Sequence, residues 1–181
     1  MPAPTDPQAA LVPAAAEYLD TLENPRVELR AGAGEPDFGR LVEVWRSAVR
    51  ATHHFLSSQD IAFYEDRMAR EYLPAVDVTV AVVDGRIVGF SGLAEGRLEM
   101  LFVDDDHRGT GVGSVLLADA LHRYPALTLD VNEQNPTALA FYQRRGFVVT
   151  GRSDLDGDGR PFPLLHLAVA TGLYGVDQVR H

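Results

Sequence analysis

The sequence predicts a mixed α/β (α+β) fold, in which one sheet is covered by helices on both faces. Residues 78–83 and 86–90 are β-branched, apolar runs on either side of Asp84-Gly85, a pair typical of a tight hairpin turn. Residues 98–103, 112–124 and 127–131 have the patterns of a strand, a helix and a buried strand, which predicts a parallel crossover. An antiparallel region therefore adjoins one parallel connection.

Three elements are predicted before this hairpin in the sequence. A short alternating run at residues 27–30 predicts a first strand, and apolar residues at helical spacing over residues 41–49 predict the helix that follows. Ser57 and Asp60 have the spacing of a capping box, so a second helix is expected after them and is expected to end before Pro74.

In the C-terminal part of the domain, the sequence predicts one more helix and two strands. Asn135 is the expected N-cap of the helix, Pro136 its first residue, and Gly146 lies just beyond its end. Residues 147–150 and 164–169 are apolar enough to form two final strands around a polar loop.

Composition excludes several classes of function. Sixteen basic residues against 26 acidic ones give a net charge of −10, so the chain lacks the positive field that attracts nucleic acid or an anionic membrane. All sixteen basic residues are arginine, which excludes Schiff-base and P-loop lysine chemistry. Cysteine is absent, which excludes disulfides, thiolate metal sites and cysteine nucleophiles.

The chain is predicted to contain one domain with two tails. Residues 1–25 are rich in proline and alanine and form an N-terminal arm with at most a short helix around residues 14–22. Residues 26–170 form the domain, and residues 171–181 form a C-terminal tail. No secretion signal and no long apolar segment is visible, so we expect a soluble, cytoplasmic protein.

The segment of residues 108–113, here called the cradle, carries the most informative motif. It follows a strand, contains three alternating glycines, and opens a helix. Free N–H groups and the helix dipole favour an anion at such a helix start, and missing Cβ atoms allow it to approach closely. The spacing matches neither the dinucleotide fingerprint nor a Walker loop, and a glycine-rich turn without a ligand is the alternative.

A second segment, residues 132–147, follows the strand after the cradle. Taken alone, Asn135 is a helix cap, Tyr142 an amphipathic helix residue, and Arg144 and Arg145 partners of the helix dipole. Because the segment of residues 132–147 directly follows that strand, we expect it to lie at the same crevice as the cradle.

Together the two segments resemble the Gcn5-related N-acetyltransferase (GNAT) superfamily over residues 26–170. The acetyl-CoA motif R/Q-x-x-G-x-G/A of that family is matched by Arg108, Gly111 and Gly113. The resemblance implies a mostly antiparallel sheet of six to seven strands. The later family pattern is matched at Asn135, Ala138, Phe141, Tyr142, Gly146 and Phe147.

The resemblance also implies how acetyl-CoA is held. Backbone N–H groups of the cradle would bind the pyrophosphate, and the pantetheine would lie between splayed strands near Phe102 and Val103. A backbone N–H there would polarise the thioester carbonyl, Asn135 would contact the pantetheine arm, and Tyr142 would protonate the departing thiolate. The expected cofactor-binding residues are Phe102, Val103, Arg108, Gly109, Thr110, Gly111, Val112, Gly113, Asn135, Ala138 and Tyr142.

The sequence leaves three alternatives for the general base, and two of them are side chains expected near the acceptor site. Glu99 is expected to share a strand face with Leu101 and Val103, so its carboxylate would point toward the acceptor amine. His53 follows the first helix, in a connection that borders the acceptor site in the resembled family. Ordered water is the third alternative.

Metal binding is not expected. The run from Asp154 to Gly159 has the opening pattern of a calcium loop, but Leu165 stands where the loop needs glutamate, so we predict a hairpin turn. Its carboxylates could attract a cationic amine. His166 is interpreted as an ordinary strand residue, and the aspartates of residues 104–106 as a solvated turn.

The predicted function is direct, acetyl-CoA-dependent acetylation of an amine through a ternary complex, because no cysteine is present to carry the acetyl group. The acceptor would be a small molecule or a peptide. The alternative is a module that binds acyl-CoA without chemistry. Nucleic acid and membrane are not expected as partners, and a homodimer is left open.

Overall fold

The computed structural model describes residue 24 and residues 26–170. The predicted arm, apart from Asn24, and the predicted tail lie outside these residues. The strands are β1 (Glu28–Ala31), β2 (Asp77–Val83), β3 (Arg86–Ala94), β4 (Arg97–Val103), β5 (Thr128–Asn132), β6 (Phe147–Ser153) and β7 (Leu164–Val169). The helices are α2 (Glu35–Thr52), α3 (Ser58–Arg67), α4 (Val112–Arg123) and α5 (Pro136–Gln143), with short turns η2 (Met68–Tyr72), η3 (Leu73–Ala75) and η4 (Asp105–His107).

The strands form one seven-stranded sheet in the order β1-β2-β3-β4-β5-β7-β6. Neighbours are antiparallel except β4 and β5, which are parallel and joined through α4, so the predicted crossover is confirmed. The β2–β3 hairpin turns at Asp84 and Gly85, whose φ angles of 50° and 75° are those of the expected tight turn.

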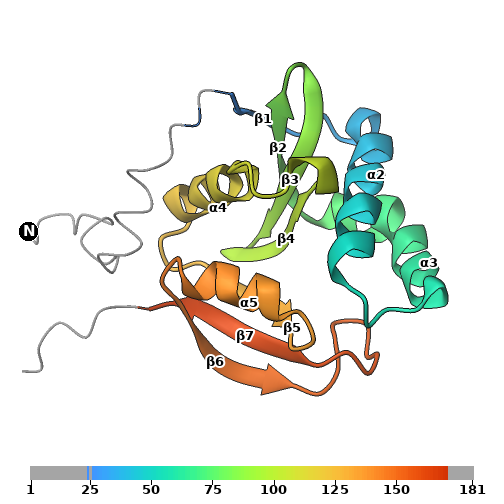
Figure 1. The fold of residues 1–181 in the computed structure, drawn as a ribbon, viewed down its shortest axis with the longest axis vertical. Coiled ribbons are helices and arrows are strands. Elements are labelled where there is room, and N and C mark those ends of the chain that lie inside the picture. Colours follow the sequence, from blue (N-terminus) through green and yellow to red (C-terminus); the bar gives the residue numbers. More distant parts are fainter. Residues whose placement is uncertain (1–23, 25, 171–181) are drawn as a thin grey trace, which may run out of the picture.

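Helices cover both faces of the sheet, as predicted (Figure 1). On one face, α2 packs Leu41 and Trp45 against Phe90 of β3. On the other face, α4 packs Leu121 against Leu129 of β5. Burial of such side chains contributes roughly 1.5–3 kcal/mol each, so these two layers hold the sheet from both sides.

The second predicted helix differs from its expected form. The capping box of Ser57 and Asp60 is present and starts α3, but the α-helix ends at Arg67. The chain continues as the π-helical turn η2 and the 3₁₀ turn η3, which contains Pro74. Proline has no N–H to donate to the preceding turn, so regular α-helical bonding does not continue up to it.

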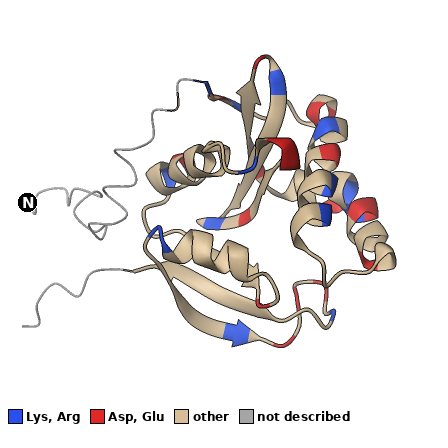
Figure 2. Ribbon diagram, in the orientation of Figure 1, with Lys and Arg blue, Asp and Glu red and all other residues tan. Residues whose placement is uncertain are grey.

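Charged residues are unevenly spread over these elements. Figure 2 shows acidic and basic residues along α2 and α3, whereas α5 carries none. No helix in the part of the chain that the structure describes is both long and apolar enough to cross a membrane.

Candidate active site

The parallel strands β4 and β5 lie side by side over only a short length. Their register pairs Arg97 with Thr128 and Leu98 with Leu129. Beyond these pairs, β4 continues along β3 and β5 continues along β7. The two strands therefore diverge, as the family resemblance implied.

A β-bulge lies at the point of divergence. The β3–β4 register pairs Gly92 with Met100 and then Leu93 with Leu98, which leaves Glu99 as an extra residue. The predicted alternation is interrupted here, because Leu98 and Leu101 contact the same hydrophobic cluster. The bulge therefore removes the basis for the prediction that the Glu99 side chain lies on the same strand face as Leu101.

A pocket of about 830 Å³ occupies this region, lined by α2, α3, η2, β4, the cradle, β5, α5 and the β6–β7 loop. It brings together most of the predicted site. The predicted residues that line it are His53, Glu99, Phe102, Val103, Arg108, Gly109, Gly111, Gly113, Asn135, Ala138 and Tyr142. Thr110 and Val112 do not line it: the Thr110 hydroxyl donates to the His107 carbonyl at 2.6 Å, and Val112 is buried.

The cradle has the geometry of an anion site. Gly111 is the N-cap of α4 with φ +90°, a left-handed conformation that favours glycine, and no side-chain hydrogen bond caps this helix. The first N–H groups of a helix have no acceptor within the helix, and here Gly111 and Gly113 line the pocket. The diphosphate of acetyl-CoA fits such a site, because it supplies acceptors and negative charge.

The segment that leads from β4 into the cradle is anchored to α2 through Asp104. Asp104 accepts hydrogen bonds from the Arg40 guanidinium at 2.8 Å and from the Ser47 hydroxyl at 3.1 Å. The pKa of Asp104 is lowered: burial opposes the shift, but these hydrogen bonds outweigh it. Asp104 is thus a charged anchor rather than only a solvated turn.

Helix α5 places Asn135 and Tyr142 in the pocket wall. The Asn135 side chain accepts a hydrogen bond from the Ala138 N–H at 3.1 Å, which confirms the predicted cap, and it is buried. The Tyr142 ring is 8% exposed and makes edge contacts with Phe141 and Phe147 at centroid distances of 5.1 and 5.7 Å. These contacts fix its position firmly.

The two predicted base residues have different surroundings. Glu99 lines the pocket, but its side chain is 41% exposed and pairs with Arg97 at 3.2 Å. His53 follows α2, and its Nδ1 lies 2.7 Å from the Thr52 hydroxyl. Burial and, secondarily, the nearby His54 imidazole lower the pKa of His53 to about 4. His53 is therefore neutral at pH 7 but a weak base.

The β6–β7 loop, residues 154–163, closes the other end of the pocket against α3 and η2. The Tyr64 hydroxyl donates to Asp156, and the Tyr72 hydroxyl donates to Asp158 at 2.8 Å. Burial, and then these hydrogen bonds to carboxylates, raise the pKa of both tyrosines, so both stay protonated as donors. Residues 154–159 form a turn between antiparallel strands, as predicted.

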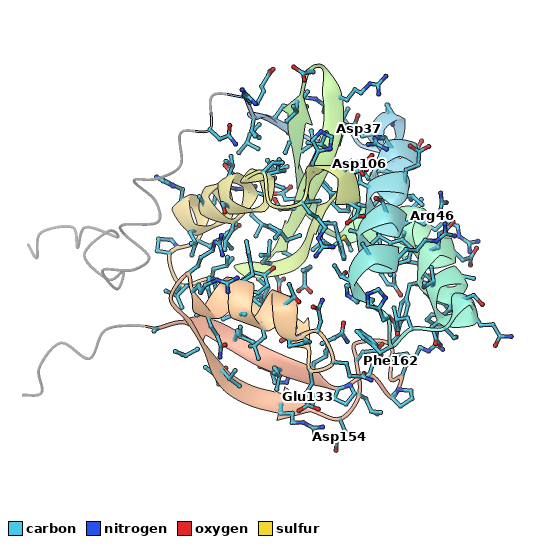
Figure 3. All side chains as sticks on the ribbon, viewed as in Figure 1. Asp37, Arg46, Asp106, Glu133, Asp154 and Phe162 are labelled. Carbon is cyan, nitrogen blue, oxygen red and sulfur yellow. The ribbon has the colours of Figure 1, made fainter. Side chains whose placement is uncertain are left out.

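Aromatic and charged contacts add to this attachment. Arg160 pairs with Asp60 at the start of α3, and its guanidinium lies 4.2 Å from the Phe63 ring centroid. Phe162 packs between Phe55 and Tyr64 at the edge of the pocket (Figure 3). Among the described residues, no group of three or more acidic or histidine side chains is placed to hold a metal ion.

Several pocket residues were not predicted from the sequence. Tyr64, Tyr72 and Asp130 line the pocket, and so does Arg145, whose guanidinium donates to the Ser114 hydroxyl at 2.9 Å. Their residue types at helical or alternating spacing are typical of ordinary surface positions. Only the docking of the loop and the divergence of the strands bring them together.

The fold and this pocket define an acetyl-CoA-dependent N-acetyltransferase, and comparison with known proteins agrees. The acetyltransferase (GNAT) domain family matches residues 48–162, and the chain belongs to this family. The predicted family, fold and cosubstrate are thereby confirmed.

Named relatives extend over most of the chain. Peptidyl-lysine N-acetyltransferase YjaB of Escherichia coli is 47% identical over 129 residues, 71% of this chain and 87% of that one. YjaB of Salmonella typhimurium is 45% identical over 129 residues, 71% of this chain and 88% of its own. The solution structure of apo-form YjaB from E. coli has a TM-score of 0.72 at 44% identity and covers 79% of this chain and 97% of that chain.

Proposed function

We propose that this N-acetyltransferase acetylates the side-chain amine of lysine residues in peptides or proteins. The observation that carries the proposal is the acidic and aromatic lining at the loop end of the pocket. Asp156 and Asp158 lie there beside Tyr64 and Tyr72. Carboxylates attract an ammonium group, and aromatic rings pack along an alkyl chain. The name of YjaB, a peptidyl-lysine N-acetyltransferase, supports the same acceptor.

Acetyl-CoA would enter from the cradle side. Bound there, it supplies a thioester whose carbonyl carbon receives the amine. The uncapped start of α4 would hold the diphosphate, and the unpaired edge of β4 at Phe102 and Val103 would hydrogen-bond the pantetheine. Asn135 and Ala138 would line that arm from α5.

Tyr142 would act as the general acid. Tyr142 lines the pocket, and its ring packs against Phe141 and Phe147. A phenol is protonated at neutral pH and can give its proton to a departing thiolate within hydrogen-bonding distance. A positioned donor of this kind contributes about 10²–10⁴-fold to a rate.

The acceptor class is tested with three amines and acetyl-CoA, using thiol release and mass spectrometry. The first is a peptide with a blocked N-terminus and one lysine. The second is the same peptide with a free N-terminus and arginine in place of lysine, and the third is spermidine. We expect acetylation of the lysine peptide with the highest kcat/KM. Acetylation of only the α-amine or only spermidine would contradict the proposal.

Other expectations from the sequence stay predictions. They are a cytoplasmic location, the absence of nucleic acid and membrane partners, and the division into arm, domain and tail. A homodimer also stays open. The acyl-CoA sensor is disfavoured by membership in an acetyltransferase family.

A further inference from the structure

Asn24, the residue of the predicted arm that the structure describes, contacts the cradle. Its side-chain amide donates a hydrogen bond to the Thr110 carbonyl at 3.0 Å. A Cβ at Gly111 would lie 3.2 Å from Nδ2 of Asn24, so the amide also lies against the Gly111 backbone. A residue 86 positions away in the sequence therefore touches the loop that we propose to hold the diphosphate.

Local hydrogen bonds hold the Asn24 side chain in one orientation. Its Oδ1 accepts from the Arg26 N–H at 3.2 Å, in a turn that asparagine commonly forms with the backbone two residues on. The Asn24 main-chain carbonyl accepts from the Val27 N–H at 3.0 Å. Because Oδ1 faces a donor, Nδ2 is the end of the amide that faces the Thr110 carbonyl. Asn24 thus presents a donor to the cradle.

Apolar packing and strand pairing attach the same part of the chain to the domain. Val27 packs against a buried cluster that contains Val112, the first residue of α4. Leu29 of β1 packs against the same cluster, and β1 pairs with β2. The place of Asn24 beside the cradle is therefore supported by contacts other than its own hydrogen bond.

The contact with Asn24 fixes the direction of one peptide unit. The peptide bond between Thr110 and Gly111 is trans, so its C=O and N–H groups point in opposite directions. The Thr110 carbonyl points to Asn24, which does not line the pocket, whereas Gly111 does. Among the described residues, no group accepts a hydrogen bond from the Gly111 N–H. This N–H is directed away from Asn24 and is free to bind a ligand.

Glycine at position 111 would allow this peptide unit to turn over. Such a reversal changes ψ of Thr110 and φ of Gly111, and glycine adopts negative φ about as readily as the +90° found here. The preceding part of the loop is held, because the Thr110 N–H and hydroxyl both donate to the His107 carbonyl, at 3.4 and 2.6 Å. Among the described contacts, the bond from Asn24 is the one that selects the direction of the peptide unit.

We infer that Asn24 is a positioning residue for acetyl-CoA, because it holds the Thr110 carbonyl outward and so directs the Gly111 N–H at the diphosphate. This inference rests on the proposed binding of the diphosphate at the cradle. In the reversed unit, the Thr110 carbonyl would face the phosphate oxygens, and their like partial charges would repel. The affinity for the cosubstrate then depends on the fraction of molecules with the outward carbonyl. Asn24 acts through Thr110 and takes no part in the chemistry.

The first test is the Kd of free CoA, measured by calorimetry for wild type and Asn24→Ala. Free CoA carries the diphosphate and needs no acceptor amine. A hydrogen bond of ordinary strength corresponds to roughly a two- to twelvefold change in an equilibrium, so we expect Kd to rise by a factor in this range. An unchanged Kd would overturn the inference.

Thr150→Val is the matched control for this substitution. It also removes an exposed side-chain donor to a backbone carbonyl, the bond from the Thr150 hydroxyl to the His166 carbonyl at 3.2 Å. Thr150 lies outside the pocket lining, so we expect the wild-type Kd. A rise in Kd equal to that of Asn24→Ala would mean that any such loss weakens binding, which contradicts a specific role for Asn24.

A second variant separates the donor from the turn. Asn24→Asp keeps an oxygen that can accept from the Arg26 N–H, but it has no donor for the Thr110 carbonyl. Its negative charge would also repel the diphosphate. We expect a loss of affinity at least as large as that of Asn24→Ala, and the excess should shrink at high salt. If Asn24 served only to form the turn, Asn24→Asp would bind CoA like wild type, and the inference would be wrong.

Steady-state kinetics supply a readout that general damage would change differently. With the lysine peptide as acceptor, Asn24→Ala should raise KM for acetyl-CoA by the same factor as Kd and leave kcat unchanged, because saturating cosubstrate restores the bound state. A fall in kcat at unchanged KM would contradict positioning. If no lysine peptide is acetylated, the proposed acceptor fails, and the calorimetric result still decides on Asn24.

The cradle itself is tested with pantetheine, which lacks the diphosphate. Wild type should bind CoA more tightly than pantetheine by at least about tenfold, because hydrogen bonds to charged groups are strong. Equal affinity would mean that the cradle does not hold the diphosphate, and the inference would fail with that assignment. Tighter binding of CoA by wild type, without a loss in the two Asn24 variants, would overturn the inference alone.

Discussion

The hydroxyl of Tyr142 is a single group whose removal tests the chemistry. Phenylalanine at this position keeps the ring contacts with Phe141 and Phe147. We expect Tyr142→Phe to lower kcat by about 100- to 1,000-fold while acetyl-CoA affinity changes little, because the acid acts only in the transition state. Thiol-release kinetics and calorimetry measure the two effects. Tyr124→Phe, outside the pocket lining, is the control, and an unchanged kcat in Tyr142→Phe would remove this residue from the mechanism.

A second prediction at the residue scale concerns stability and pH. The pKa of His53 is about 4 in the folded chain against an ordinary 6.5, so below pH 6.5 the unfolded chain takes up the proton first. Stability is therefore full above pH 6.5 and falls as the pH drops toward 4, by on the order of 1 kcal/mol at pH 5.5. His53→Gln should lose less stability than wild type between pH 7 and 5.5 in thermal unfolding. An identical loss in both proteins would contradict the assigned burial.

At the scale of elements, the attachment of the β6–β7 loop to α3 and η2 shapes the acceptor end. Tyr64→Phe with Tyr72→Phe removes both hydroxyl donors and leaves the rings in place. We expect KM for the lysine peptide to rise about tenfold, since each lost hydrogen bond is worth roughly 0.5–1.5 kcal/mol, while acetyl-CoA affinity stays unchanged. Arg70→Gln, which breaks the exposed ion pair between Arg70 of η2 and Asp66 of α3, is the control. An unchanged KM would show that the loop does not shape the site.

The elements also show what could be predicted from the sequence. The hairpin at Asp84-Gly85, the crossover and the Asn135 cap were predictable because each depends on local patterns of turn residues, periodicity and capping. The bulge at Glu99 was not, because an extra residue appears only when β4 is paired with β3. The contact of Asp130 with His166 joins residues 36 positions apart, and alternation within each strand carries no signal for it.

At the scale of the whole molecule, the cradle couples cosubstrate binding to stability. A ligand that binds only the folded chain stabilises it by about 2.7 kcal/mol at 100 times its Kd, so acetyl-CoA should raise Tm by several degrees. Gly113→Trp should abolish this shift, because Gly113 lines the pocket and its Cβ would lie 3.6 Å from Phe141, in contact with surrounding groups.

Gly39→Trp is the matched control for that experiment. Both glycines lie in helices without a positive φ, but a Cβ at Gly39 meets nothing within 4 Å. The two substitutions therefore change helix propensity alike, but only Gly113→Trp places a large side chain at the cosubstrate pocket. We expect Gly39→Trp to keep the full ligand-induced rise in Tm, measured by thermal unfolding over a range of acetyl-CoA concentrations. A full rise in Gly113→Trp would place the cosubstrate elsewhere, whereas its loss in both variants would mean that the fold, and not the cradle, had been disturbed.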